Sequence, residues 1–290
     1  MTNQEQPASG NPDIFKLVPV PKRLTPYVRR IMRADTCENL DFTFDVCATG
    51  YCYLSWVWRG RWTGYVDDSL VFDTESDGRV VSSGQVVNAR VGCRISGQPG
   101  QIAVEFQPFG QYQLLGIAGD ATIDTAIAPD KLNPALQTPL QPLMDTAPHI
   151  EGDVALSLMT TFLSDLVGGA RVLPPDLLEA VRRMEEADGA LRISALCTDL
   201  GLSNRTFRRR FHNLTGLTPK RFCRVLQVTK ALNAVLERKG ASLSEIALKA
   251  GFSDQAHFNR AFRDFLHDSP LHGTENVEAT LALFVGQARG

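Results

Sequence analysis

The first part of the chain alternates between hydrophobic and polar residues with the period of two that is typical of β-strands. The segments DFTFDVC (41–47) and QIAVEFQPFG (101–110) alternate in this way, and YCYLSWVW (51–58) is rich in residues that favour buried strands. Turn residues separate these segments, at Thr49-Gly50, Arg59-Gly60, Asp77-Gly78 and Gly97-Gln98-Pro99-Gly100. Residues 14 to about 118 are therefore predicted to form short strands in a compact barrel or sandwich.

From about residue 120 the hydrophobic period becomes that of α-helices. The segment 151–168 carries a hydrophobic stripe formed by Val154, Leu158, Phe162 and either Leu163 or Leu166. The stripe either packs in the core or forms a dimer face. Gly168-Gly169 and Pro174-Pro175 then interrupt the chain, so we place a domain boundary there, between a first domain of residues 14–170 and a second of residues 176–273.

Beyond Pro175 the pattern predicts only helices. Their expected ranges are 176–188, 192–202, 204–214, 219–238, 242–252 and 253–266. Asp176 and Ser203 are suited to cap the first turns of two of these helices, and Gly201 suits a left-handed C-terminal position. The fold class is therefore α+β, a β domain followed by an all-α domain.

The all-α part contains an internal repeat. LCTDLGLSNRTFRRRF (196–211) matches ALKAGFSDQAHFNRAF (247–262), so that Gly201 pairs with Gly251 and Phe207 pairs with Phe258. Each copy consists of a short helix, a turn that contains glycine, a serine and a second helix. This arrangement is the helix-turn-helix motif, present twice.

The charge of the chain is divided unevenly. The net charge is −2, but residues 190–273 hold 14 Lys and Arg against 6 Asp and Glu, which leaves a net charge of −10 on the remainder. A basic end on an acidic chain indicates a polyanionic partner. In the second helix of the first copy, Phe207 and Phe211 face the core while arginines occupy the other faces, which suits the DNA major groove.

Candidate DNA contacts follow from these faces. Arginine bonds guanine edges, and Gln and Asn suit adenine edges. The predicted base-contacting residues are Arg205, Arg208 and Arg209 in the first copy, and Gln255, Ala256, Asn259 and Arg260 in the second. The predicted phosphate contacts are Lys220, Arg221 and Lys249. The linking helix of about 20 residues would be about 30 Å long, close to the roughly 34 Å of one DNA turn.

Residues 176–273 resemble the DNA-binding domain of AraC/XylS-family transcription regulators. The matching positions are Gly201-Leu202-Ser203, Phe207, Phe211, Thr215-Gly216, Thr218-Pro219, Ile246-Ala247, Gly251-Phe252, Phe258, Arg260, Phe262, Phe265 and Ser269-Pro270. One departure is Gln227, where the family often has an arginine. The resemblance implies promoter DNA and RNA polymerase as partners, a homodimer, and an N-terminal cupin-like β-barrel that binds a small effector.

A cupin-like barrel raises the alternative of a metal enzyme. The first histidine of the chain is His149, beyond the predicted barrel, and the six cysteines form no CxxC pair. We therefore expect no catalytic residue, no metal site and no cofactor. No run of about 18 apolar residues and no secretory signal pattern is present, so we expect a cytoplasmic protein without a membrane span.

One basic cluster stands out in the predicted barrel domain. PKRLTPYVRRIMR (21–33) holds Lys22, Arg23, Arg29, Arg30 and Arg33 without an acidic residue. In a helix or an ordered loop, Arg29 and Arg33 would face one ligand, and arginine pairs with phosphate and guanine. The RxxxR spacing is similar to the PilZ motif that binds cyclic di-GMP, although Asp67-x-Ser69 lacks the glycine of that motif's second part. The alternatives are a solvated or interdomain basic face and a contact with the DNA backbone.

Together these observations predict a transcription regulator, more specifically an activator, with polar tails at residues 1–13 and 274–290. The leading effector is cyclic di-GMP, and a sugar or another small molecule in the barrel is the alternative. A different class, a nucleic-acid-binding protein without sequence preference, would need only charge. The uncharged Gln255 and Asn259 argue against that class.

Overall fold

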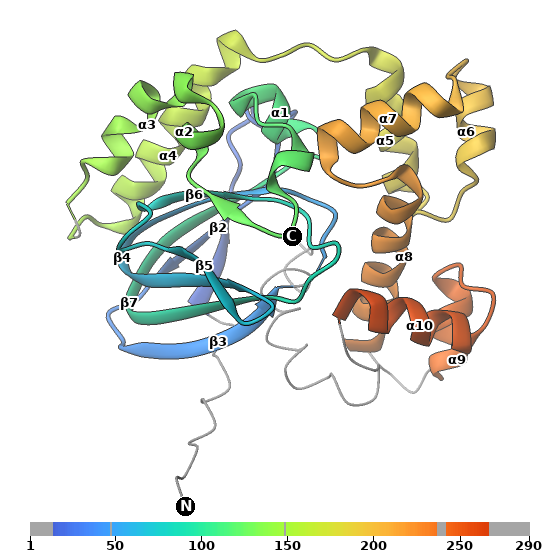
Figure 1. The fold of residues 1–290 in the computed structure, drawn as a ribbon, viewed down its shortest axis with the longest axis horizontal. Helices are drawn as coiled ribbons and strands as arrows, with labels where there is room; N and C mark the ends of the chain where they lie inside the picture. The colour runs from blue at the N-terminus through green and yellow to red at the C-terminus, as the bar shows by residue number, and fades with distance from the viewer. Residues whose placement is uncertain (1–13, 47, 148, 237–241, 267–290) are drawn as a thin grey trace, which may run out of the picture.

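The computed structural model describes all residues except 1–13, 47, 148, 237–241 and 267–290. The predicted tails and Ser269-Pro270 lie outside the described residues. A curled antiparallel sheet forms the N-terminal half, and helices form the rest (Figure 1). The chain thus has the predicted α+β class. None of the described helices is both long and apolar enough to cross a membrane.

Among the described residues the sheet has eight strands. They are β1 (Phe15–Val18), β2 (Val28–Asp35), β3 (Leu40–Val46), β4 (Tyr53–Val66), β5 (Ser69–Asp73), β6 (Val80–Ser83), β7 (Val91–Phe106) and β8 (Ala126–Ile127). The strand order is β1-β2-β7-β4-β6-β8, with β3 also paired to β7 and β5 paired to β4. The long antiparallel pair of β4 and β7 therefore runs through both halves of the curled sheet.

Two predicted turns are wrong, because β4 and β7 continue through them. Arg59-Gly60 lies inside β4 and Gly97-Gln98-Pro99-Gly100 lies inside β7. The β4–β7 register shifts between Val57 and Arg61, and Gly60 and Gly97 have positive φ angles of 77° and 83°. Glycine allows this conformation, so both strands bend without ending. The bend curls the sheet into a barrel-like shape.

The aromatic strand β4 is buried on both faces. Leu54, Trp56 and Trp58 pack with the helices outside the sheet, and Tyr53 points into the opposite cluster with Phe44 and Met32. This alternation explains why the segment reads as a continuous apolar run rather than as a half-buried strand. Trp56 and Trp58 are core residues and not a binding surface, with ring centroids 5.4 Å apart.

Short helices cover one face of the sheet. They are α1 (Gly110–Leu115), η2 (Gly119–Thr122), α2 (Pro129–Leu132), η3 (Pro134–Leu136), α3 (Gln137–Met144), α4 (Gly152–Leu166) and η4 (Val167–Gly169). The predicted stripe of α4 is corrected. Ala155, Met159, Phe162 and Leu163 are buried against the sheet, while Val154 is 48% exposed.

In the part of the chain that the structure describes, residues 170–174 connect η4 to six further helices. The predicted domain boundary falls in this segment and stays a prediction. The six helices are α5 (Pro175–Glu186), α6 (Ile193–Asp199), α7 (Asn204–Thr215), α8 (Pro219–Leu236), α9 (Leu243–Lys249) and α10 (Gln255–Leu266). Ser203 is the N-cap residue of α7, but its side chain forms no cap hydrogen bond in the described structure. Asp176 lies in the first turn of α5, behind the N-cap Pro174.

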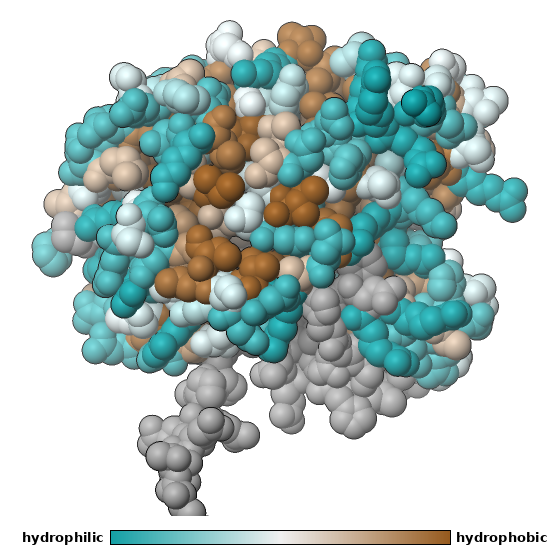
Figure 2. Space-filling model, in the orientation of Figure 1, coloured by the Kyte–Doolittle hydropathy of each residue, from teal (hydrophilic) through white to brown (hydrophobic). Residues whose placement is uncertain are grey.

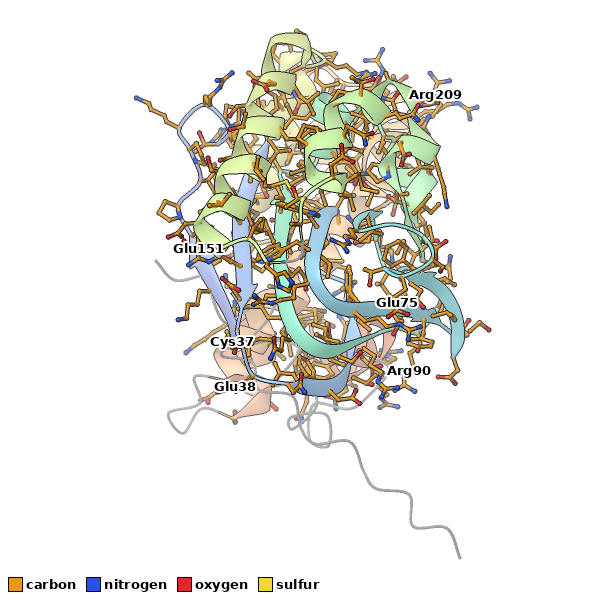
Figure 3. All side chains as sticks on the ribbon, turned by 90° about the vertical axis from the view of Figure 1, so that its left-hand side faces the viewer. Cys37, Glu38, Glu75, Arg90, Glu151 and Arg209 are labelled. Carbon is orange, nitrogen blue, oxygen red and sulfur yellow. The ribbon has the colours of Figure 1, made fainter. Side chains whose placement is uncertain are left out.

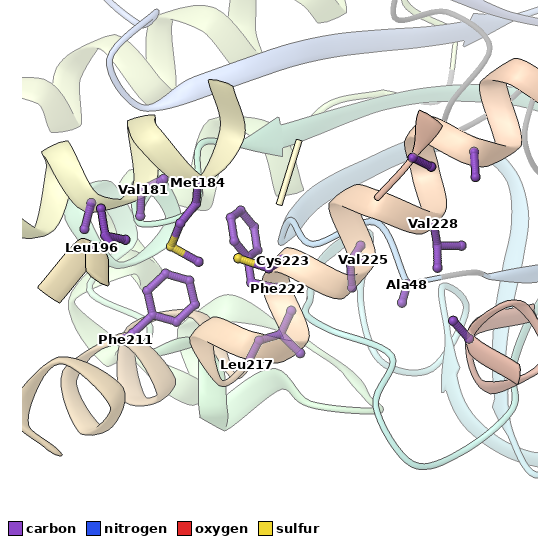
Figure 4. Packing of buried hydrophobic residues seen from close by; sticks show 14 of the residues in the cluster. Ala48, Val181, Met184, Leu196, Phe211, Leu217, Phe222, Cys223, Val225 and Val228 are labelled. Carbon is purple, nitrogen blue, oxygen red and sulfur yellow. The ribbon is translucent and has the colours of Figure 1, made fainter. Parts of the chain in front are cut away.

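One hydrophobic cluster joins the two halves of the chain. Phe211 of α7 and Phe222 of α8 lie at its centre, with ring centroids 5.4 Å apart (Figure 4). From the sheet side, Phe109 packs on Phe211 with centroids 5.8 Å apart, and Ala48 and Val86 belong to the same cluster. The first helix-turn-helix is therefore packed against the barrel.

Candidate DNA interface

The second helix of the first motif, α7, separates its faces as the sequence predicts. Phe207 and Phe211 are fully buried. Since α-helices turn about 100° per residue, Arg205 and Arg209 lie opposite these phenylalanines, and Arg208 and Arg210 lie on the two flanks. All four arginines are exposed, and Arg209 projects outward from the body of the protein (Figure 3). The side of α7 that carries Arg205 and Arg209, here called the α7 front, is therefore exposed for contact with a DNA groove.

The second motif has the same construction. Ser242 and Glu245 form a capping box at the start of α9, with the Glu245 amide donating to the Ser242 hydroxyl at 3.2 Å. Phe258 and Phe262 of α10 are buried with ring centroids 5.6 Å apart. Both motifs therefore present a polar helix over a phenylalanine core.

The predicted front of α10 is exposed only in part. Ala256 and Arg260 are exposed. Gln255 is half-buried, and its side-chain oxygen accepts a hydrogen bond of 2.8 Å from the Ser244 hydroxyl. Asn259 is half-buried too, and its Oδ1 has no hydrogen-bond partner among the described residues. This oxygen is buried, so a base edge could bond to it only after the Asn259 side chain rotates outward.

The helix α8 connects the two motifs, which lie at its opposite ends (Figure 1). Its 18 residues correspond to about 27 Å at 1.5 Å per residue. The last two residues of the predicted helix, 237 and 238, lie outside the described residues. At the position of the family departure, Gln227 accepts a hydrogen bond of 3.1 Å from Arg224. Arg224 also lies over the Phe252 ring at 5.1 Å, so it braces the second motif against α8.

The three predicted phosphate contacts differ in their surroundings. Lys220 and Lys249 are exposed. The prediction for Arg221 is corrected, because its guanidinium donates to the backbone carbonyl of Val87 in the barrel domain. Arg221 therefore holds the two domains together instead of facing solvent.

The basic cluster of the barrel is corrected as well. Arg29, Arg30 and Arg33 lie on the strand β2, not in a helix or loop. Arg29 and Arg30 both pair with Glu105, and Arg33 pairs with Asp153. Arg23 donates to the Ser164 carbonyl at 2.6 Å, and Lys22 is exposed. The arginines are thus engaged within the protein.

Glu105 is the buried acid at the centre of this cluster, with no exposed side-chain surface. Burial alone raises its pKa. Attraction to Arg30 and Arg29, with hydrogen bonds from Arg30 and the Tyr53 hydroxyl, outweighs burial, so the net pKa is lowered from its ordinary value. Glu105 therefore stays ionised between two guanidinium groups.

Sequence reasoning missed Glu105 and the contact between Tyr51 and Glu185. The signal for Glu105 was present, since a single acid within the apolar strand QIAVEF must find a cation when it is buried. The Tyr51 hydroxyl donates to Glu185 of α5 at 2.8 Å. No local pattern points to that contact, because 134 residues separate the two partners.

Comparisons with known proteins agree with this geometry. Residues 196–274 match the model of a helix-turn-helix domain. The HTH-type transcriptional activator RhaS of Escherichia coli K12 is 40% identical over 76 residues, which are 26% of this chain and 27% of RhaS. The match to these curated relatives thus spans about a quarter of their length.

Two solved structures are similar to this chain. ToxT from Vibrio cholerae is 10% identical, covering 83% of this chain and 94% of its own, with a TM-score of 0.43. An AraC-type regulator from Chromobacterium violaceum is 27% identical, covering 36% of this chain and 92% of its own, with a TM-score of 0.32. The C-terminal part of this chain is a double helix-turn-helix domain of the AraC/XylS family.

Proposed function

We propose that this protein is a transcription regulator that recognises specific promoter DNA through its two helix-turn-helix motifs. The observation that carries the proposal is that α7 exposes four arginines over a buried phenylalanine pair. The Arg205 and Arg209 side chains read guanine edges in one major groove. Ala256, Asn259 and Arg260 read a second segment.

The other partners follow from this role. We propose that the protein works in the cytoplasm as an activator and contacts RNA polymerase, since the RhaS relatives are named transcriptional activators. A homodimer is part of the proposal, because paired half-sites are common among helix-turn-helix regulators. The proposal assigns no catalytic activity. Among the described residues, no group of three His, Cys, Asp or Glu side chains could hold a metal ion.

The barrel domain is proposed to bind a small effector. Cyclic di-GMP is not the effector we propose, because the arginines expected to hold it pair with Glu105 and Asp153. A ligand with two phosphodiester groups would have to displace both carboxylates, and Glu105 is fully buried. Displacing one partner of a buried ion pair is costly.

Non-specific nucleic-acid binding is the competing function. It needs only positive charge, and it predicts equal affinity for all sequences with a steep salt dependence. The partly exposed front of α10 favours specific recognition, because Ala256 carries no charge and Asn259 is a neutral amide. A binder that used charge alone would need neither residue.

The test starts with selection of the preferred site from a pool of random DNA duplexes. The affinities of wild type, Arg209→Ala and Arg210→Ala are then measured for the selected site and for a scrambled duplex. Wild type should prefer the selected site by about 10³-fold or more. Arg209→Ala should lose about 1–3 kcal/mol on the selected site alone.

Arg210→Ala is the matched control, since it removes the same charge from the flank of the same helix. It should weaken binding to both duplexes about equally and reduce the salt slope by about one. If wild type binds both duplexes alike, the regulator proposal fails. If Arg209→Ala and Arg210→Ala behave alike, the assignment of α7 residues is wrong.

A further inference from the structure

The barrel encloses a cavity of about 80 Å³ between the β4–β7 spine and the segment that leads into β8. Its walls are mainly apolar and aromatic, and include Met32, Phe44, Trp62, Phe72, Val91 and Ala103. The adjoining outer surface is apolar over β5, where Leu70 and Val71 are exposed (Figure 2). This volume is about half of the roughly 150 Å³ of an engineered apolar cavity that holds benzene, so a molecule of one ring is the largest ligand that fits, and only with a small displacement of the wall.

The lining of the cavity contains few charged residues. Among its described lining residues there is no Lys, Arg or His. Asp124 is the single carboxylate in that lining, and its two oxygens accept the backbone N–H groups of Val87 and Asn88. An anionic ligand would therefore be buried without a counter-charge, which is strongly unfavourable.

Two polar groups of the wall lack a hydrogen-bond partner among the described residues, the side-chain oxygen of Gln85 and Nε1 of Trp62. Gln85 is only 2% exposed, and its side-chain oxygen accepts no hydrogen bond from the described residues. The amide nitrogen of Gln85 faces Cys52 Sγ at 3.9 Å. A buried acceptor without a donor is destabilising, so a hydroxyl or N–H group on a ligand would satisfy it.

We propose that the barrel cavity binds a small uncharged aromatic or alicyclic molecule whose single hydroxyl donates to Gln85. The proposal rests on the proposed function, in which the barrel is the effector domain, and it specifies the chemical class of that effector. Phenol is the simplest member of the class.

The cavity wall is also part of the contact with the DNA-binding domain. Gly84, Gln85 and Val86 line the cavity. Val86 is buried in the cluster that contains Phe211 and Phe222, and the next carbonyl, that of Val87, accepts the hydrogen bond from Arg221. A ligand that moves Gln85 therefore acts on a segment that contacts α8 directly.

Isothermal titration of the full chain compares phenol with toluene, which has a similar ring but no hydroxyl. Benzoate, benzylamine and L-rhamnose test an anion, a cation and a sugar. Phenol should bind with one site per chain and more tightly than toluene by roughly three- to tenfold, the usual value of one hydrogen bond. The three other compounds should bind at least tenfold more weakly than phenol.

The variant Gln85→Met keeps the side-chain length and removes the acceptor. Phenol affinity should then fall to that of toluene, and toluene affinity should not change. Gln141→Met, on the exposed surface of α3, is the matched control and should preserve the preference for phenol. Thermal unfolding of each variant verifies that the fold persists.

Three results would overturn the cavity proposal: no binding of phenol, equal or tighter binding of benzoate, benzylamine or L-rhamnose, or an unchanged phenol preference in a folded Gln85→Met protein. The DNA selection experiment distinguishes failure of the cavity proposal from failure of the regulator proposal. Sequence-specific DNA binding without phenol binding leaves the regulator intact and removes only the ligand class. Phenol binding without sequence-specific DNA binding would support the cavity proposal and contradict the regulator proposal.

Discussion

The hydroxyl of Tyr51 donates a hydrogen bond of 2.8 Å to Oε1 of Glu185, and this bond joins the barrel to the first helix of the DNA-binding domain. The guanidinium of Arg29 lies 4.4 Å from the centre of the Tyr51 ring. Burial raises the pKa of Tyr51, so the phenol keeps its proton. A fixed donor at the interface thus connects the Glu105 cluster to α5.

Replacing Tyr51 with Phe should remove one hydrogen bond from this interface and keep the packing of the ring. The ring would stay beside Arg29 and Phe222, while Glu185 would lose its donor. We expect the free energy of unfolding to fall by about 1 kcal/mol, because the half-buried Glu185 loses one hydrogen bond. Urea unfolding measures the change. Tyr27→Phe is the control, since the Tyr27 hydroxyl forms no hydrogen bond within the described structure; equal losses would contradict the role of Tyr51.

Replacing Glu105 with Gln should be among the most damaging changes in the barrel. The variant leaves the Arg29 and Arg30 charges without their buried counter-charge. We expect a loss of about 3–5 kcal/mol, as for other buried ion pairs that lose one partner. Glu75→Gln is the control, because Glu75 is 66% exposed beside Arg61 and should cost less than about 1 kcal/mol. Similar unfolding midpoints for both variants would refute the claim.

The two acids of this network should respond to pH in opposite directions. The lowered pKa of Glu105 contributes stability above the unfolded value of about 4.3, and this contribution is lost as the pH falls through the folded pKa. Burial raises the pKa of Glu185, so its ionisation costs stability as the pH rises through that value. Unfolding measured across acidic and neutral pH should show Glu105→Gln least harmful in acid. Glu185→Gln should become relatively more stable towards neutral pH, and parallel curves would contradict both assignments.

Gly119 holds the first helix-turn-helix close to the barrel. A Cβ atom at Gly119 would lie 2.3 Å from the carbonyl carbon of Thr215 at the end of α7, so Gly119→Ala must push α7 away. We expect a loss of about 1–3 kcal/mol, as for overpacked cores, and faster proteolysis near residues 170–174. Gly168→Ala is the matched control, because a Cβ there meets nothing within 4 Å. If both variants unfold like wild type, α7 does not depend on this contact.

The two N-cap serines should differ in their energetic weight. Ser242 bonds the Glu245 amide in a capping box, and Ser242→Ala should cost about 1 kcal/mol. Ser203 is the N-cap residue of α7 but forms no cap bond in the described structure, so Ser203→Ala should cost only a few tenths of a kcal/mol. Hydrogen exchange of α9 and α7 measures each effect locally. The reverse order would show that the capping geometry is wrong.

Local patterns were enough for the helices after Pro175 and for the exposed arginine side of α7. Phe207 and Phe211 recur at one helical turn, so their burial leaves Arg205 and Arg209 on the opposite face. Glycine misled the strand prediction at Gly60 and Gly97, because a positive φ serves a bend within a paired strand as well as a turn. The presence of a glycine therefore does not show whether the strand ends in a turn or continues through a bend.

The sequence by itself determined the α+β class, the doubled helix-turn-helix and the basic front of α7, because these depend on residue spacing along one element. The tertiary structure decided which charged side chains are paired within the protein and which remain exposed to a partner. Arg30 is the register partner of Glu105 across β2 and β7, and Arg221 reaches Val87 over 134 residues. Such pairs depend on strand register and domain packing, and those are set by burial across the whole fold, which no local pattern records.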